Sequence, residues 1–127
     1  MTAGLTLDAG ALIALERGEE RMRALLQRFR SEPEAILHIP AGVLAQVLRN
    51  PRRQARISRL LAHHRVVVVA LDEQTARVAG LLLGLRDGSD AIDASVVVCA
   101  RRHGQAVVTG DLDDLRRLDP GLRLTLV

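Results

Sequence analysis

Short apolar runs alternate along this chain with longer segments of helical periodicity. The runs predict buried strands because they are apolar at consecutive positions and too short for helices. They span residues 5–7, 36–39, 66–71, 106–109 and 122–127. Between them, apolar residues recur every three or four positions, as in helices that cover a sheet. This alternation predicts an α/β fold with a central parallel sheet of four to five strands, covered by helices on both faces.

The expected helix boundaries coincide with residues that begin or end helices. A break near Gly18 divides the first helical segment in two, and the third helix is expected to end before Pro51. The sixth helix should end near Gly104. The later helices have candidate caps, which are Asp72, then Ser89 or Asp90, and then Asp111.

Composition limits the class of protein. A chain of 127 residues that is 48% hydrophobic predicts one domain over residues 1–127, with a sizeable core. The single cysteine, Cys99, excludes an internal disulfide and a paired-cysteine zinc site, which suits a reducing cytosol. No signal peptide and no run long enough to span a membrane are evident. We therefore expect a cytoplasmic protein that does not bind to a membrane.

Charge is segregated along the chain. The net charge is only +3, and every basic residue is arginine. Residues 35–71 contain no acidic residue, but they contain Arg49, Arg52, Arg53, Arg56, Arg59 and Arg65. Such a segment can bind phosphate groups, or it can be an ordinary solvated helix face. Aromatic residues are nearly absent, which argues against base stacking on the protein.

Aspartates follow two of the predicted strands. Asp8 comes directly after the first strand, and Asp111 follows the fourth by two residues. Asp90 and Asp93 are three residues apart at the start of the helix that leads into the fourth strand, so they share one helix face. Sites in open α/β sheets lie beyond the carboxyl ends of the strands, where the strand order reverses. We therefore expect these carboxylates to meet there.

A second interpretation stays open for each aspartate taken singly. Asp8, Asp90 and Asp111 each precede a helix, where aspartate is a preferred cap, and Asp93 can complete a capping box. Several carboxylates at one edge repel each other, however, and a bound cation relieves this repulsion. Hard oxygen ligands suit Mg²⁺, with Mn²⁺ as a possible substitute.

Three motifs together resemble a PIN-domain protein of the VapC type, the toxin half of a bacterial toxin–antitoxin pair. They are Leu7-Asp8, Asp93-Ala94-Ser95-Val96 eleven residues before Gly104, and Thr109-Gly110-Asp111 followed by Asp114-Leu115. The resemblance covers nearly the whole chain. It implies a three-layer α/β/α fold with strand order 3-2-1-4-5.

The resemblance also implies a function. It implies a Mg²⁺-dependent endoribonuclease, usually a homodimer, that cuts RNA such as tRNA or rRNA and is blocked by a VapB-type antitoxin. Asp8, Asp93 and Asp111 match three acidic positions of the family. Asp90 can supplement Asp93, or replace it in an alternative alignment, and Asp114 can supplement Asp111.

The chain departs from the family pattern at two places. The family glutamate after the second strand is replaced by Gln46, in Val43-Leu44-Ala45-Gln46-Val47. Asp8 is followed by Ala9-Gly10, where the family tends to have hydroxyl or amide side chains. Both changes predict weaker metal binding or slow catalysis.

Other functions fit less well. A catalytically weak or silent PIN-like module that binds RNA or a protein remains the alternative, because Gln46 is neutral. A receiver-like phosphoacceptor would need a lysine, which the chain lacks. A dinucleotide-binding fold would need a G-x-G-x-x-G turn after a strand, and none is present.

Overall fold

The computed structural model describes residues 4–88 and 90–127, and its centre is a five-stranded parallel sheet. The strands are β1 (Gly4–Leu7), β2 (Ile36–Pro40), β3 (Val66–Val69), β4 (Ala106–Thr109) and β5 (Leu124–Leu126). Their order, β3-β2-β1-β4-β5, confirms the order that the resemblance implies. In the middle, Leu5 of β1 lies opposite both Leu37 of β2 and Ala106 of β4. The order of the strands reverses between β1 and β4, and a site in an open α/β sheet is expected at that point.

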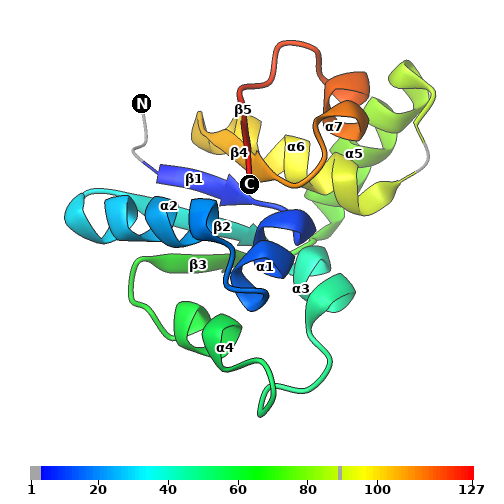
Figure 1. The fold of residues 1–127 in the computed structure, drawn as a ribbon. Coiled ribbons are helices and arrows are strands. Elements are labelled where there is room, and N and C mark those ends of the chain that lie inside the picture. Colours follow the sequence, from blue (N-terminus) through cyan, green and yellow to red (C-terminus); the bar gives the residue numbers. More distant parts are fainter. Residues whose placement is uncertain (1–3, 89) are drawn as a thin grey trace.

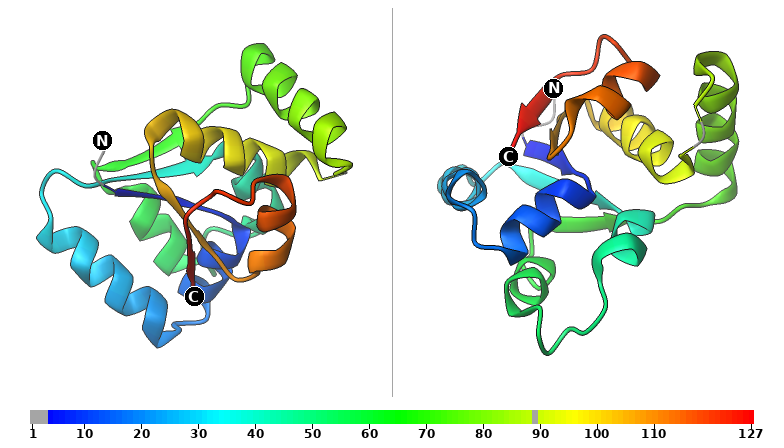
Figure 2. Two further views of the ribbon diagram at one scale, coloured as in Figure 1. Left: turned by 90° about the horizontal axis from the view of Figure 1, so that it is seen from above. Right: turned by 45° about the vertical axis from the view of Figure 1, so that its right-hand side comes forward.

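Helices cover both faces of the sheet and complete three layers (Figure 1). One face carries α1 (Ala9–Glu16), α2 (Glu20–Ser31), α3 (Ala41–Val47) and α4 (Ala55–Leu61). The other carries α5 (Glu73–Arg86), α6 (Ala91–His103) and α7 (Leu112–Leu118). Figure 2 shows α5 and α2 on opposite sides of the molecule. No helix in the described part of the chain is long and apolar enough to cross a membrane.

Helix α6 is the most deeply buried helix next to the site. Its residues 94–100 are all buried, because the sheet covers one side and α5 and α7 cover others. A helix that is apolar around its circumference belongs in a core. Its end is also fixed, since Gly104 has a left-handed φ of 61° and terminates the helix as predicted. Because residues 94–100 are buried, the first turn of α6, which precedes them, is held close to the carboxyl ends of β1 and β4.

The edge strands differ from the sequence prediction. Strand β3 ends at Val69 rather than at residue 71, and β5 covers only Leu124–Leu126 rather than residues 122–127. Val67 and Val68 of β3 remain 42% and 43% exposed, so the expectation of apolar strands covered on both faces is wrong here. Edge strands have one unpaired side and less helix above them, which shortens them and exposes their side chains.

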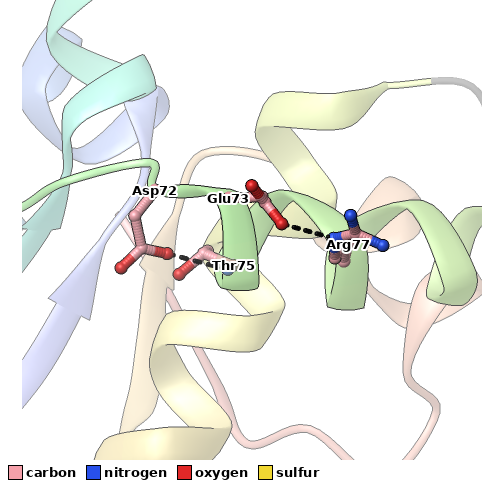
Figure 3. A network of polar contacts seen from close by, with 4 residues as sticks. All are labelled: Asp72, Glu73, Thr75 and Arg77. Carbon is pink, nitrogen blue, oxygen red and sulfur yellow. Dashed lines mark hydrogen bonds and ion pairs between the residues drawn. The ribbon is translucent and has the colours of Figure 1, made fainter.

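Helix α5 begins where the sequence predicts. The Asp72 carboxylate accepts a hydrogen bond from the backbone N–H of Thr75 at 2.8 Å, and Glu73 pairs with Arg77 at 2.8 Å (Figure 3). The hydrogen bond from Thr75 stabilises the charged carboxylate and lowers the pKa of Asp72. Asp72 is thus an aspartate whose cap function is satisfied and which lies outside the candidate site described next.

Candidate functional site

A cavity of about 460 Å³ opens at the carboxyl ends of β1 and β4, and we call it the carboxylate pocket. All five aspartates singled out in the sequence line it, together with Gln46. They are Asp8, Asp90, Asp93, Asp111 and Asp114. They come from the end of β1, the start of α6, and the turn and first helical turn after β4. The fold therefore brings distant acidic segments together, and their chemical roles remain a prediction.

Asp8 is the deepest of these carboxylates, with only 9% of the residue exposed. Its backbone N–H donates to the Val108 carbonyl at 3.1 Å, which joins the end of β1 to β4. Its Oδ1 accepts from the Ala11 N–H at 3.1 Å, so it also caps α1. Burial raises the pKa of Asp8, although the nearby Thr109 hydroxyl and backbone N–H groups oppose the rise. The cap and the site interpretations are therefore compatible, because a carboxylate has a second oxygen.

The first turn of α6 separates Asp90 from Asp93. Asp90 is exposed, and its Oδ1 accepts from the backbone N–H groups of Ile92 and Asp93, at 2.9 and 3.0 Å. It is the cap of α6, and the alternative cap, Ser89, lies outside the described residues. Asp93 is only partly exposed, and no hydrogen bond from its side chain back to Asp90 is found among the described residues. The predicted capping box is therefore only half formed, which leaves the Asp93 carboxylate available to the pocket.

The electrostatics of the pocket concentrate on Asp93. Burial raises the pKa of this carboxyl to about 6, and the surrounding carboxylates add to the rise. These neighbours are, in decreasing order of effect, Asp90, Asp114, Asp8 and Asp111. Asp93 therefore lies within electrostatic reach of all four other carboxyl groups of the pocket.

Asp111 and Asp114 occupy the turn and the first helical turn after β4. The Thr109 hydroxyl donates to the Asp111 carbonyl at 2.8 Å and accepts from the Asp111 N–H at 3.0 Å, which fixes the turn. Oδ1 of Asp111 accepts from the Asp113 N–H at 3.0 Å and caps α7, as the sequence predicts. Asp111 and Asp114 are both exposed, so their free oxygens can reach a ligand from solvent.

Two glycines allow the Asp8 and Asp111 segments to approach each other. A Cβ on Gly10 would lie 2.5 Å from the backbone nitrogen of Gly110, which is closer than real Cβ atoms come. The start of α1 therefore packs directly on the turn after β4. Gly10, noted above as a departure from the family pattern, has a structural reason in this chain. A larger residue there would push the two carboxylates apart.

Sequence reasoning did not find two charged residues of the pocket. Arg17 and Glu19 line it from the turn between α1 and α2, and both are exposed. The sequence signal was the break at Gly18, which places both residues in a turn after the helix that follows Asp8. Gln46, on the exposed side of α3, lies in the same pocket, as its place in the sequence motif suggests.

The carboxylates surround a cavity but do not converge on a point. Among residues 4–88 and 90–127, no group of three or more His, Cys, Asp or Glu side chains is already arranged to hold a metal ion. The pKa values of Asp8 and Asp93 are raised first by burial, and neighbouring carboxylates add to both shifts. This arrangement favours cation binding over the binding of an anion in the same place.

The sequence matches the model of one protein family, and the structure is similar to several solved structures. The family model of the PIN domain matches residues 5–120. No curated protein matches the sequence significantly. Among solved structures, VapBC2 from Rickettsia felis, bound to a DNA fragment from its promoter, has a TM-score of 0.73 at 15% identity, covering 98% of each chain.

Two further structures have similar folds. Mycobacterium tuberculosis VapC20, a toxin that cleaves the sarcin–ricin loop, has a TM-score of 0.65 at 13% identity and covers 93% of this chain and 95% of its own. FitAcB from Neisseria gonorrhoeae has a TM-score of 0.64 at 18% identity and covers 94% and 95%. At these identities the structures show that the three-layer fold is shared.

Proposed function

The chain belongs to the PIN domain family, and from this membership we propose that it is a metal-dependent endoribonuclease, the toxin of a VapBC-like toxin–antitoxin pair. The observation that carries the proposal is the carboxylate pocket, where five aspartates from separate segments line one cavity at the strand ends. Caps alone do not explain the pocket, since Asp93 and Asp114 cap no helix.

The donor set fits Mg²⁺, with Mn²⁺ as a substitute. Aspartate oxygens and the Gln46 amide oxygen are hard ligands. A divalent cation would relieve the mutual repulsion that adds to the effect of burial on the pKa of Asp93. We assign the holding of the metal to Asp8, Asp93 and Asp111, with Asp90 and Asp114 as supplementary ligands. When bound, such a metal activates water and neutralises charge on the phosphate.

The chain's own groups then have distinct tasks. Asp8 is buried and anchored to α1 and β4, so it is a rigid ligand. Asp111 is held by the Thr109 turn and is open to solvent, which suits a ligand close to incoming RNA. The Gln46 amide can donate to a phosphate oxygen or to water, but it adds no negative charge. The products we expect carry a 5′-phosphate and a 3′-hydroxyl.

The proposed partners follow from the same function. We propose that a VapB-type antitoxin blocks the pocket, that tRNA or rRNA is the substrate, and that the protein works in the cytoplasm. We also propose a homodimer in which exposed apolar residues of α5 are covered, since Leu81 and Leu85 are 70% and 82% exposed. Such exposure is unusual on a free monomer.

A second candidate is a silent PIN-like module that binds RNA or a protein without cutting. Gln46 favours it, because this residue lines the pocket without contributing a charge. Cleavage of a structured RNA pool tests both candidates, with Mg²⁺, with Mn²⁺ and with EDTA. Metal-dependent cleavage by the parent protein supports the nuclease, and its absence supports the silent module.

Two variants sharpen this test. Asp8→Asn keeps the oxygen that caps α1 and removes the charge, so it should abolish cleavage and leave the fold intact. Asp72→Asn is the matched control, because Asp72 makes the same kind of cap on α5, outside the pocket (Figure 3). Equal activity of Asp8→Asn and Asp72→Asn would refute the proposed role of Asp8.

A further inference from the structure

We propose that a second cavity, between α2 and α4, binds backbone phosphates of the RNA that flank the bond to be cut. This cavity has a volume of about 510 Å³, and we call it the arginine pocket. It has an apolar floor of Leu15, Leu26 and Leu60. Its polar lining consists of Arg23, Arg30, Arg56 and Arg59. The inference rests on the proposed function for the identity of the polyanion.

The arginine pocket is built around a preorganised guanidinium. Arg56 donates from Nη1 to the Glu16 carbonyl at 2.9 Å, which ties α4 to the end of α1. Gly18 has a φ of +70°, and a Cβ there would lie 3.2–3.3 Å from three atoms of the Arg56 guanidinium. The flat group therefore packs closely over the glycine. A guanidinium held in this way loses little further freedom when it binds an anion, and its remaining N–H groups fit phosphate oxygens.

The positive charge of this cavity is almost uncompensated. Arg23 reaches Glu20 at 3.5 Å across the exposed surface. Within the described residues, Arg30, Arg56 and Arg59 have no carboxylate within ion-pair distance. Like charges gathered in one cavity repel each other, and a bound polyanion removes that repulsion. Of the arginines in the acid-free segment 35–71, Arg56 and Arg59 lie here, whereas Arg49 donates to backbone carbonyls of Ala45 and Leu48.

The two cavities adjoin each other along one turn of chain. Arg17 and Glu19 line the carboxylate pocket, while Gly18, between them, lines the arginine pocket. On α1, Ala14 faces the first cavity and Leu15 the second. A strand whose phosphodiester lies in the carboxylate pocket therefore has a neighbouring cationic cavity for the phosphates beside it. This adjacency favours RNA over an acidic protein segment as the occupant.

Binding of a fluorescein-labelled single-stranded RNA tests the inference. All variants would carry Asp8→Asn and be measured in EDTA over a series of NaCl concentrations, so that binding is separated from cleavage. Arg30→Gln/Arg59→Gln removes two exposed charges of the arginine pocket. Arg77→Gln/Arg86→Gln removes two exposed charges from α5, on the opposite side of the molecule (Figure 2).

Loss of two phosphate contacts should reduce the slope of log K against log salt by about 1.4 and weaken binding roughly 25-fold at ~0.1 M salt. The α5 control should change binding by less than about threefold, and both doubles should keep the melting temperature of the parent. Equal binding by the two doubles would overturn the inference, as would the absence of RNA binding in all of them. Capture of a polyglutamate peptide, but not RNA, through Arg30 and Arg59 would overturn it in favour of an acidic protein partner.

Cleavage by the protein with Asp8 intact separates this inference from the proposed function. If that protein cuts RNA while the Arg30→Gln/Arg59→Gln variant binds normally, the nuclease stands and the arginine pocket is not its subsite. If it does not cut RNA, but binding still depends on Arg30 and Arg59, the subsite stands and the nuclease proposal fails.

Discussion

Replacement of Asp93 by asparagine is expected to stabilise the metal-free protein near neutral pH. The folded state raises the pKa of this carboxyl from 3.8 to about 6, chiefly through burial and then through the neighbouring aspartates. A raised carboxyl pKa means that the fold prefers the protonated form. Stability contributed by that preference is complete below about pH 4 and is lost as the pH rises through about 6. The asparagine side chain is neutral throughout, so the variant does not suffer this loss.

The size of the effect follows from the same shift. At 1.36 kcal/mol per unit, a change from 3.8 to about 6 corresponds to roughly 3 kcal/mol as an upper bound. Partial exposure of Asp93 screens the repulsion, and its charge in the first turn of α6 gains ~0.5 kcal/mol from the helix dipole. We therefore expect a net gain of about 1–2 kcal/mol for the variant above pH 7, or roughly 4–8 °C in melting temperature.

The assay is thermal and urea unfolding of both proteins in EDTA, from about pH 4 to pH 8. The gain should shrink strongly at the acid end, where Asp93 is protonated in the folded chain and close to half protonated in the unfolded chain, whose pKa is 3.8. Asp113→Asn is the matched control, because Asp113 is an exposed first-turn aspartate that does not line the carboxylate pocket. With Mg²⁺ at about 100 times its dissociation constant, the parent should gain ~2.7 kcal/mol and become the more stable protein.

Three results would each refute a part of this reasoning. A variant less stable than the parent in EDTA at pH 7.5 would mean that Asp93 is not crowded by other carboxylates. A gain that is the same at both ends of the pH range would mean that it arises from packing and not from charge. If Mg²⁺ stabilises parent and variant equally, Asp93 does not hold the metal.

Three other changes test separate parts of the structure. Gln46→Glu should tighten Mg²⁺ binding, measured by calorimetry, because it adds a carboxylate to the pocket; unchanged affinity would contradict a role for this position in metal binding. Gly10→Ala should cost about 1–3 kcal/mol of unfolding free energy in urea by clashing with Gly110, whereas Gly84→Ala, in open space on α5, should be neutral or stabilising. Leu85→Glu should convert the proposed dimer to a monomer in light scattering, and an intact dimer would exclude this part of α5 as the interface.

Much of the fold could be predicted because local sequence and global fold agree. Asp72, Asp90 and Asp111 all cap the helices that they were expected to cap. The edge strands were overestimated, because an apolar run does not reveal how many neighbours a strand will have. Val67 and Val68 have the same apolar sequence character as buried strand residues but lie at an uncovered edge.

The candidate site was predicted less completely than the fold. The aspartates follow strands and precede helices, so topology alone places them at one sheet edge. Arg17 and Glu19 enter the carboxylate pocket from a turn whose direction depends on tertiary packing. The arginine pocket depends on the crossing of α2 and α4, since Arg30 and Arg59 come from different helices. Spacing along the chain carries no signal for such a pair.

The contact between Gly10 and Gly110 has a consequence for when, during synthesis of the chain, the carboxylate pocket can form. The two halves of the carboxylate pocket are separated by about a hundred residues, and β1 reaches its full pairing only when β4 is present. A chain synthesised only as far as the end of α5 contains Asp8 and Gln46, but none of the other aspartates of the carboxylate pocket. Because β1 and β4 must close this long loop, the pocket forms late in folding. The complete set of carboxylates is therefore absent from a nascent chain until synthesis is almost finished.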